Sequence, residues 1–221
     1  MAARPSLAVD HLLVACDDVA KTQQAFSNRF GAAFADGGAH PGQGTRNALG
    51  AIGDGVYLEL LGPDPSQSVR ADWLAGAQDG AVFHWAARCD DLGAVADVLA
   101  AQGLAHSGII DGARTAADGA RLTWKLLFPA PSAFGAVMPF FIDWLDTDHP
   151  SLSAPDVGVL KDWMLKTPEA PALNALFNAF ETALAAQQSA RASLQAVVAA
   201  PSGEVVLHAA DPVGRGVSPF A

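Results

Sequence analysis

A short pattern that occurs twice limits what this 221-residue chain can fold into more than any other feature. The copies are Val9–Asp18 and Val82–Asp91, and each has a histidine in an apolar run, a cysteine five residues later and then two aspartates. The apolar run predicts a strand, and the aspartates are suited to cap a helix. A strand and helix repeated 73 residues apart are too widely spaced for a solenoid and indicate a duplicated half-domain.

The first half is expected to fold as a βαβββ module over residues 6–62. Gly31 ends its helix, and Gly53-Asp54-Gly55 is a strong hairpin signal between its last two strands. The expected elements are a strand at 7–15, a helix at 19–30, a short strand near 32–35, and a hairpin of strands at 46–52 and 56–61.

The remaining chain repeats this plan once more and then departs from it. The second module, residues 79–146, has expected elements at 81–87, 92–102, 121–128 and 137–144. Residues 151–211 are interpreted as a third, degenerate βαββ module with a helix from Thr167-Pro168-Glu169 to about Gln188, and residues 212–221 as a tail. The predicted fold class is α+β, with paired βαβββ modules in residues 6–150 forming one cupped, mixed and antiparallel sheet.

Composition excludes several classes of function. The net charge is −10 and the thirteen Lys and Arg residues are scattered, which argues against a nucleic-acid partner. No stretch reaches the roughly twenty apolar residues of a membrane span, so we expect no membrane partner and a cytoplasmic protein. Cys16 and Cys89 stand at equivalent repeat positions and are expected to be small buried hydrophobes, since no signal peptide favours a disulfide.

The repeat also predicts where chemistry would gather. His11 and His84 would occupy equivalent places on the first strands of the two modules. Glu59 interrupts an apolar strand and must be paired or face a wet cavity, and Asp143 matches it if the register shifts by one residue. Taken singly, each histidine is more often a structural residue. Two histidines and one or two carboxylates on one concave surface are, however, the ligands of a divalent metal such as catalytic zinc or ferrous iron.

The glycine-rich segment from Gly37 to Asn47 has two interpretations. It is either a turn before a strand or a lip over the cavity. In the second case His40 would contact substrate or metal, and Arg46 or Asn47 would bind an anionic or carbonyl group. His149, beside Pro150, is interpreted as a turn residue.

These features resemble the vicinal oxygen chelate superfamily, which includes glyoxalase I, extradiol dioxygenases and bleomycin-resistance proteins. Within it, four segments of the chain are similar to a glyoxalase-like branch. They are Asp10-His11, His40–Asn47, Tyr57–Leu60 and Pro139–Trp144.

The resemblance implies a divalent metal, zinc, nickel, iron or manganese, held by His11, Glu59, His84 and Asp143. Glu59 or Asp143 would be the catalytic base. Because Asp143 stands where glyoxalase I has a glutamate, three ligands and a water are an alternative to four. The expected function is that of a metal-dependent lyase, isomerase or dioxygenase acting on a small oxygen-rich substrate.

The alternative function is metal-free binding or sequestration of a small molecule, as in drug-resistance proteins. In either case the expected partner is a small molecule. The two modules would pair within one chain or between the chains of a homodimer.

Overall fold

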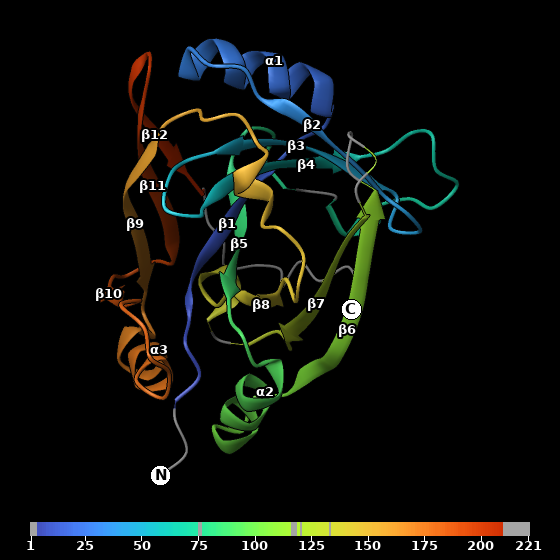
Figure 1. The fold of residues 1–221 in the computed structure, drawn as a ribbon. Helices are drawn as coiled ribbons and strands as arrows, with labels where there is room; N and C mark the ends of the chain where they lie inside the picture. Colours follow the sequence, from blue (N-terminus) through green and yellow to red (C-terminus); the bar gives the residue numbers. More distant parts are fainter. Residues whose placement is uncertain (1–3, 75–76, 116–118, 120, 133, 210–221) are drawn as a thin grey trace.

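The computed structural model describes residues 4–74, 77–115, 119, 121–132 and 134–209, and the predicted tail at 212–221 lies outside them. These residues form an eight-stranded mixed sheet and a four-stranded sheet (Figure 1). The predicted α+β class with a cupped sheet is confirmed. The large sheet contains β1 (Ala8–Ala15), β2 (Ala35–His40), β3 (Thr45–Ala51), β4 (Tyr57–Pro63), β5 (Val82–Arg88), β6 (His106–Thr115), β7 (Arg121–Pro129) and β8 (Phe140–Asp143).

The large sheet consists of two copies of one topology. Its strand order is β2-β3-β4-β1-β5-β8-β7-β6. In the first copy β1 is parallel to β4, and in the second β5 is parallel to β8; the remaining pairings within each copy are antiparallel. The central strands β1 and β5 run antiparallel to each other, which joins the copies within one chain.

The repeated aspartates cap the two long helices, as the sequence predicts. Asp18 accepts a hydrogen bond from the Lys21 backbone at the start of α1 (Val19–Phe30), which ends at Gly31 with φ of 67°. Asp91 caps α2 (Leu92–Ala101) in the same way. Among the described residues, no helix is long and apolar enough to cross a membrane.

The large sheet curls until its two edge strands meet. The Arg114 guanidinium of β6 donates to the Gly37 carbonyl of β2, and a Cβ on Gly38 would lie 3.1 Å from the Thr115 carbonyl oxygen. Contact between β2 and β6 therefore closes the cup, and the inner face of the sheet lines its hollow.

Two predicted elements differ from the observed ones, and one observed strand was not predicted. Part of the Gly37–Asn47 segment is strand β2 and not a loop, because its glycines accommodate a bulge and the Asn47 side chain. Strand β6 was not predicted from its mixed sequence. The third helix, α3 (Ala170–Phe177), ends well before Gln188 because the Asn174 side chain holds the backbone of Ala186 and folds the chain back.

The small sheet covers the outer face of the large one (Figure 1). Its strands are β9 (Val159–Thr167), β10 (Ala186–Gln188), β11 (Ser193–Ala200) and β12 (Gly203–His208), in the order β10-β9-β11-β12. This order differs from that of the two modules, since β9 lies inside the sheet between β10 and β11. Trp163 of β9 contacts Trp85 of β5 edge to face, and one hydrophobic cluster joins all three units. Short one-turn helices occur at Asp72–Leu74, Gly135–Val137 and Pro150–Leu152.

Gly37 is expected to tolerate no side chain. A Cβ there would lie 2.1 Å from Asn47 Oδ1, a distance at which one of the two must move. We expect Gly37→Ala to lower the free energy of unfolding by about 1 to 3 kcal/mol, the usual cost of overpacking, as measured by urea denaturation. In an Asn47→Ala background the same change should cost clearly less. Equal costs in both backgrounds would contradict this contact.

Candidate active site

The inner face of the cup holds one pocket that contains most of the predicted site residues. Its empty volume, open mouth included, is about 710 Å³. Strands β1 to β4 supply its polar lining, and strands β5 to β8 supply mainly aromatic and aliphatic lining. The polar or titratable side chains that line it are His11, His40, Gln43, Thr45, Asn47, Tyr57, Glu59 and His84.

A β-bulge places a buried aspartate against His11. In the pairing of β1 with β5, Val9 lies opposite Ala87 and His11 opposite Ala86, so Asp10 is the extra residue. Bulges redirect side chains, and here the Asp10 Oδ1 atom lies 2.6 Å from His11 Nδ1. In a regular strand the side chains of Asp10 and His11 would lie on opposite faces. The bulge brings them together.

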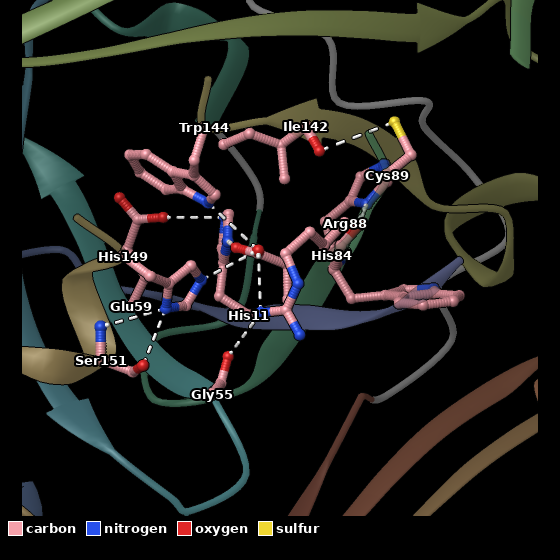
Figure 2. Close-up of polar contacts among 12 residues, drawn as sticks. His11, Gly55, Glu59, His84, Arg88, Cys89, Ile142, Trp144, His149 and Ser151 are labelled. Carbon is pink, nitrogen blue, oxygen red and sulfur yellow. Dashed lines mark hydrogen bonds and ion pairs between the residues drawn. The ribbon is translucent and has the colours of Figure 1, made fainter. Parts of the chain in front are cut away.

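Asp10 is a fully buried carboxylate with three nitrogen partners besides a distant arginine. Its Oδ2 atom accepts from Trp144 Nε1 at 3.1 Å and lies 3.0 Å from His149 Nε2 and 3.9 Å from Arg88 Nη1. Figure 2 shows Trp144, His149 and Arg88 around His11. Burial by itself raises the pKa of Asp10, but the hydrogen bonds and charges of His11 and His149 outweigh it and lower the pKa to about 2. Asp10 is therefore ionised.

The ionised Asp10 fixes the tautomer of both neighbouring histidines. The Ser151 backbone donates to His149 Nδ1, so His149 Nε2 carries the proton that it donates to Asp10. Likewise His11 Nδ1 must carry a proton, because a carboxylate 2.6 Å away is acceptor only. The free position of His11 is thus Nε2, on the pocket side.

His11 and Glu59 face each other at the floor of the pocket. His11 Nε2 lies 3.3 Å from Glu59 Oε2. If nothing lay between these atoms, two lone pairs would face each other in a buried space. With no ion bound, one proton shared by the imidazole and the carboxyl group would pair them, and a divalent ion bound to both atoms would replace that proton. Glu59 is paired, as its position on an apolar strand predicts.

Asn47 and His40 complete the polar side of the pocket. Asn47 Nδ2 donates to Glu59 Oε1 at 2.7 Å and lies 3.3 Å from His40 Nε2. His40 Nε2 is therefore an acceptor, and Nδ1 donates to Thr45 Oγ1 at 2.9 Å. Burial lowers the pKa of His40 and outweighs the charge of Glu59, which raises it. The lowered pKa keeps the ring neutral.

Two predicted site residues do not reach the pocket. Asp143 accepts a hydrogen bond from the Leu145 backbone, whereas its neighbours Ile142 and Trp144 line the cup. Arg46 likewise lies between the pocket-lining Thr45 and Asn47, with its guanidinium 3.7 Å from Asp36. Strand alternation directs both side chains away from the hollow.

Comparison with known proteins agrees with this geometry. A family model described as a glyoxalase-like domain matches residues 9–191. This chain belongs to that family. The predicted resemblance to the vicinal oxygen chelate superfamily is thereby confirmed. No curated protein sequence matches this one.

Several solved structures share the fold of this glyoxalase-like domain. A hypothetical protein from Staphylococcus aureus has a TM-score of 0.63 and 16% identity, over 91% of this chain and 85% of that one. A hypothetical protein from Bacillus halodurans has a TM-score of 0.50 and 20% identity, over 65% and 98%. Methylmalonyl-CoA epimerase from Mycobacterium tuberculosis has a TM-score of 0.47 and 23% identity, over 62% and 87%. The first two structures show a likeness of fold alone.

The duplicated glyoxalase-like modules are not chemically equivalent. In the first module, the residue two positions after His11 is Leu13, and it lies opposite Glu59 of β4. In the second module, the residue two positions after His84 is Ala86, and it lies opposite Phe140 of β8. Phe140 is therefore the counterpart of Glu59. Phe83 is the bulged residue before His84, as Asp10 is before His11. His11 is thus flanked by two acids, and its counterpart by two phenylalanines.

The donor set of this glyoxalase-like domain does not fit the four-ligand metal site that the sequence suggests. Phe140 takes the place expected for the second carboxylate, and its ring lies between the two histidines, 5.6 Å from His11 and 5.5 Å from His84 between centroids. The orientation of His84 is also fixed by its neighbour, since the Trp85 backbone N–H donates to His84 Nδ1 at 2.8 Å. This contact is shorter than the 3.1 Å between Nδ1 and the Trp85 carbonyl oxygen. Burial lowers its pKa to about 4, so the ring is neutral. Across the described residues, no three His, Cys, Asp or Glu side chains are arranged to hold a metal ion.

Sequence reasoning missed two residues of the site. Asp10 was named only within the Asp10-His11 segment of the family resemblance and was given no role, because regular strand alternation places it on the face opposite His11. His149 was interpreted as a turn residue, yet it contacts Asp10 from 139 positions away. No spacing in the sequence signals this contact.

The cysteines have no part in the site. Cys16 and Cys89 are free and buried, and burial raises the pKa of each thiol to about 12. Both are therefore unreactive packing residues, as their repeat positions suggest.

Proposed function

We propose that this protein is a proton-transfer enzyme of the isomerase or lyase kind, in which His11 and Glu59 act on a small molecule held in the cup. The observation that carries this proposal is the 3.3 Å contact between His11 Nε2 and Glu59 Oε2, with His11 oriented from behind by the buried Asp10. A base fixed in this way, on the floor of a largely apolar pocket, is an arrangement suited to general acid–base catalysis.

The chemical step would start at a carbon next to a carbonyl group. The pair takes up the substrate proton as a second proton; the C–H bond breaks and its electron pair moves onto the carbonyl oxygen. The pair then holds one positive charge, which the ionised Asp10 balances from behind. Return of a proton to the same or a neighbouring carbon, or loss of a group from that neighbour, completes the reaction.

A metal-dependent reaction is a second candidate function. His11 Nε2 and Glu59 Oε2 are two donors at a distance that one divalent ion could bridge. It has less support, because Phe140 stands where a further carboxylate would be needed. The third candidate, ligand binding without chemistry, would use the same pocket.

Two measurements on one preparation separate these candidates. The first is elemental analysis of protein purified without chelators. The second is deuterium incorporation from D₂O into 2-tetralone, a ketone with exchangeable C–H bonds, followed by NMR against a buffer blank. We expect less than about 0.1 divalent metal per chain and exchange at least about tenfold above the blank, since a positioned acid–base pair contributes more than that.

The variants sharpen the same test. Glu59→Gln and His11→Gln should reduce exchange to the blank, while Asp143→Asn, which points out of the cup, should leave it unchanged. Stoichiometric metal that is lost in the two site variants would favour the metal-dependent candidate. Absence of both metal and exchange, with 2-tetralone bound, would favour the binding protein.

A further inference from the structure

We propose that the pocket binds a flat, mainly apolar ring compound that carries a hydroxyl group, with the hydroxyl donating to Glu59 and the ring lying against the second half of the cup. This names a ligand class for the site of the proposed function. It depends on that function only for the location of the pocket, and it is tested by binding alone.

The polar end of the pocket offers mainly hydrogen-bond acceptors. Both hydrogens of Asn47 Nδ2 are directed to Glu59 and His40. The single lone pair of His40 Nε2 is therefore already occupied by Asn47, whereas the carboxylate oxygens of Glu59 keep lone pairs besides those that face Asn47 and His11. A ligand that fits this end brings a donor, and an O–H group leaves no buried acceptor unpaired.

The opposite end offers flat apolar surfaces. Phe128 and Phe140 are stacked with centroids 5.0 Å apart, and Trp124 and Trp144 lie 5.4 Å apart. Flat rings pack well against such side chains. The apolar wall from the second half consists of Phe83, Trp124, Leu126, Phe128, Phe140, Ile142 and Trp144.

Charge at the polar end favours a neutral ligand over an ion. A carboxylate would face Glu59 and the acceptor nitrogen of His40. An ammonium ion would enter the field of Arg114, a buried cation of the inner face. Burial is the main cause of the lowered pKa of His40, and the charge of Arg114 lowers it further. A neutral hydroxyl avoids both costs.

A series of naphthalenes that differ in one substituent tests this by calorimetric titration. The probes are 2-naphthol, 2-methoxynaphthalene, 2-naphthoate and 2-naphthylmethylammonium. We expect 2-naphthol to bind at least about tenfold more tightly than each of the others, the effect of one hydrogen bond to an otherwise unpaired group. Tighter binding of the ammonium, the carboxylate or the methyl ether would overturn the proposal.

Variants show which end of the pocket makes each contribution. Glu59→Leu should remove most of the preference for 2-naphthol over its methyl ether, and Phe140→Ala should weaken both about tenfold without changing their ratio. Arg46→Ala, which lies outside the hollow, should change neither. An unchanged ratio in Glu59→Leu would refute the assigned orientation.

A catechol probe separates this inference from metal chelation. If no metal ion is bound in the pocket, the second hydroxyl of 2,3-dihydroxynaphthalene has nothing to chelate. The Kd of 2,3-dihydroxynaphthalene should then lie within about threefold of that of 2-naphthol. Much tighter binding that requires added Zn²⁺ would overturn the inference. Failure of deuterium exchange with the naphthol preference intact would refute only the proposed reaction.

Discussion

Replacement of Asp10 by asparagine is expected to lower the free energy of unfolding by about 3 to 5 kcal/mol, the range found when one partner of a buried ionic network is removed. The carboxylate accepts from His11, Trp144 and His149, and it is fully buried. The amide of asparagine has an oxygen that can accept, but its NH₂ group would face the N–H donors that now bind the carboxylate. Urea denaturation followed by tryptophan fluorescence measures the change.

A matched control and a pH series test the same carboxylate. Asp97→Asn, on the exposed face of α2, should change stability by less than about 0.5 kcal/mol. The folded-state pKa of Asp10, about 2, lies below the ordinary value of 3.8 for an aspartate side chain. Its contribution is therefore present above pH of about 4 and is lost as the pH falls through 2, by roughly 2 kcal/mol in total. Asp10→Asn should lose this part of the acid dependence. If the variant and the wild type have parallel stability curves between pH 4 and 2, Asp10 is not ionised as described.

Restoring a carboxylate in the second module is expected to create a metal site. Phe140 stands at the position equivalent to Glu59, between the rings of His11 and His84. Phe140→Glu would bring two histidines and two carboxylates to one place, a donor set that zinc accepts. We expect this variant to retain about one Zn²⁺ per chain after dialysis, against less than about 0.1 for the wild type.

Phe128→Glu provides the control for this gain of function. Phe128 lines the same wall of the pocket but belongs to β7, outside the register that relates the two modules. It should remain free of metal. If Phe140→Glu folds, as judged by circular dichroism, and still binds no zinc, the equivalence of Phe140 and Glu59 is refuted.

The overall topology of the fold could be predicted from the sequence because the local signals for its strands and helices occur in both copies of the repeat. The apolar runs, the capping aspartates and the Gly53-Asp54-Gly55 turn all act locally, and each was found where predicted. Strand β6 was missed because half of its side chains are exposed and its apolar alternation is weak. The end of α3 depends on the contact from Asn174 to Ala186, which no local pattern reveals.

The site was predictable only in its first half. His11 and Glu59 stand out as polar residues in apolar strands, and His40 and Asn47 lie near them as expected. Asp143 was matched to Glu59 by a shift of one residue in the alignment of the two strands, whereas the observed register puts Phe140 at the equivalent place. A one-residue change of register reverses the face on which a strand residue lies, and sequence alone does not fix that register.

The small sheet behind β1 and β5 makes the chain a single unfolding unit. Leu12, Val14 and Trp85 on the outer face belong to the same cluster as Leu194 and Val198 of β11. The backbone of Val157 also donates to Ala51, which ties the start of the last unit to β3. A fragment cut near residue 150 would expose a wide apolar surface over β1 and β5, and exposed apolar surfaces of this kind cause proteins to self-associate. Protease treatment of the native protein should therefore yield either the whole chain or small peptides, with no lasting N-terminal half.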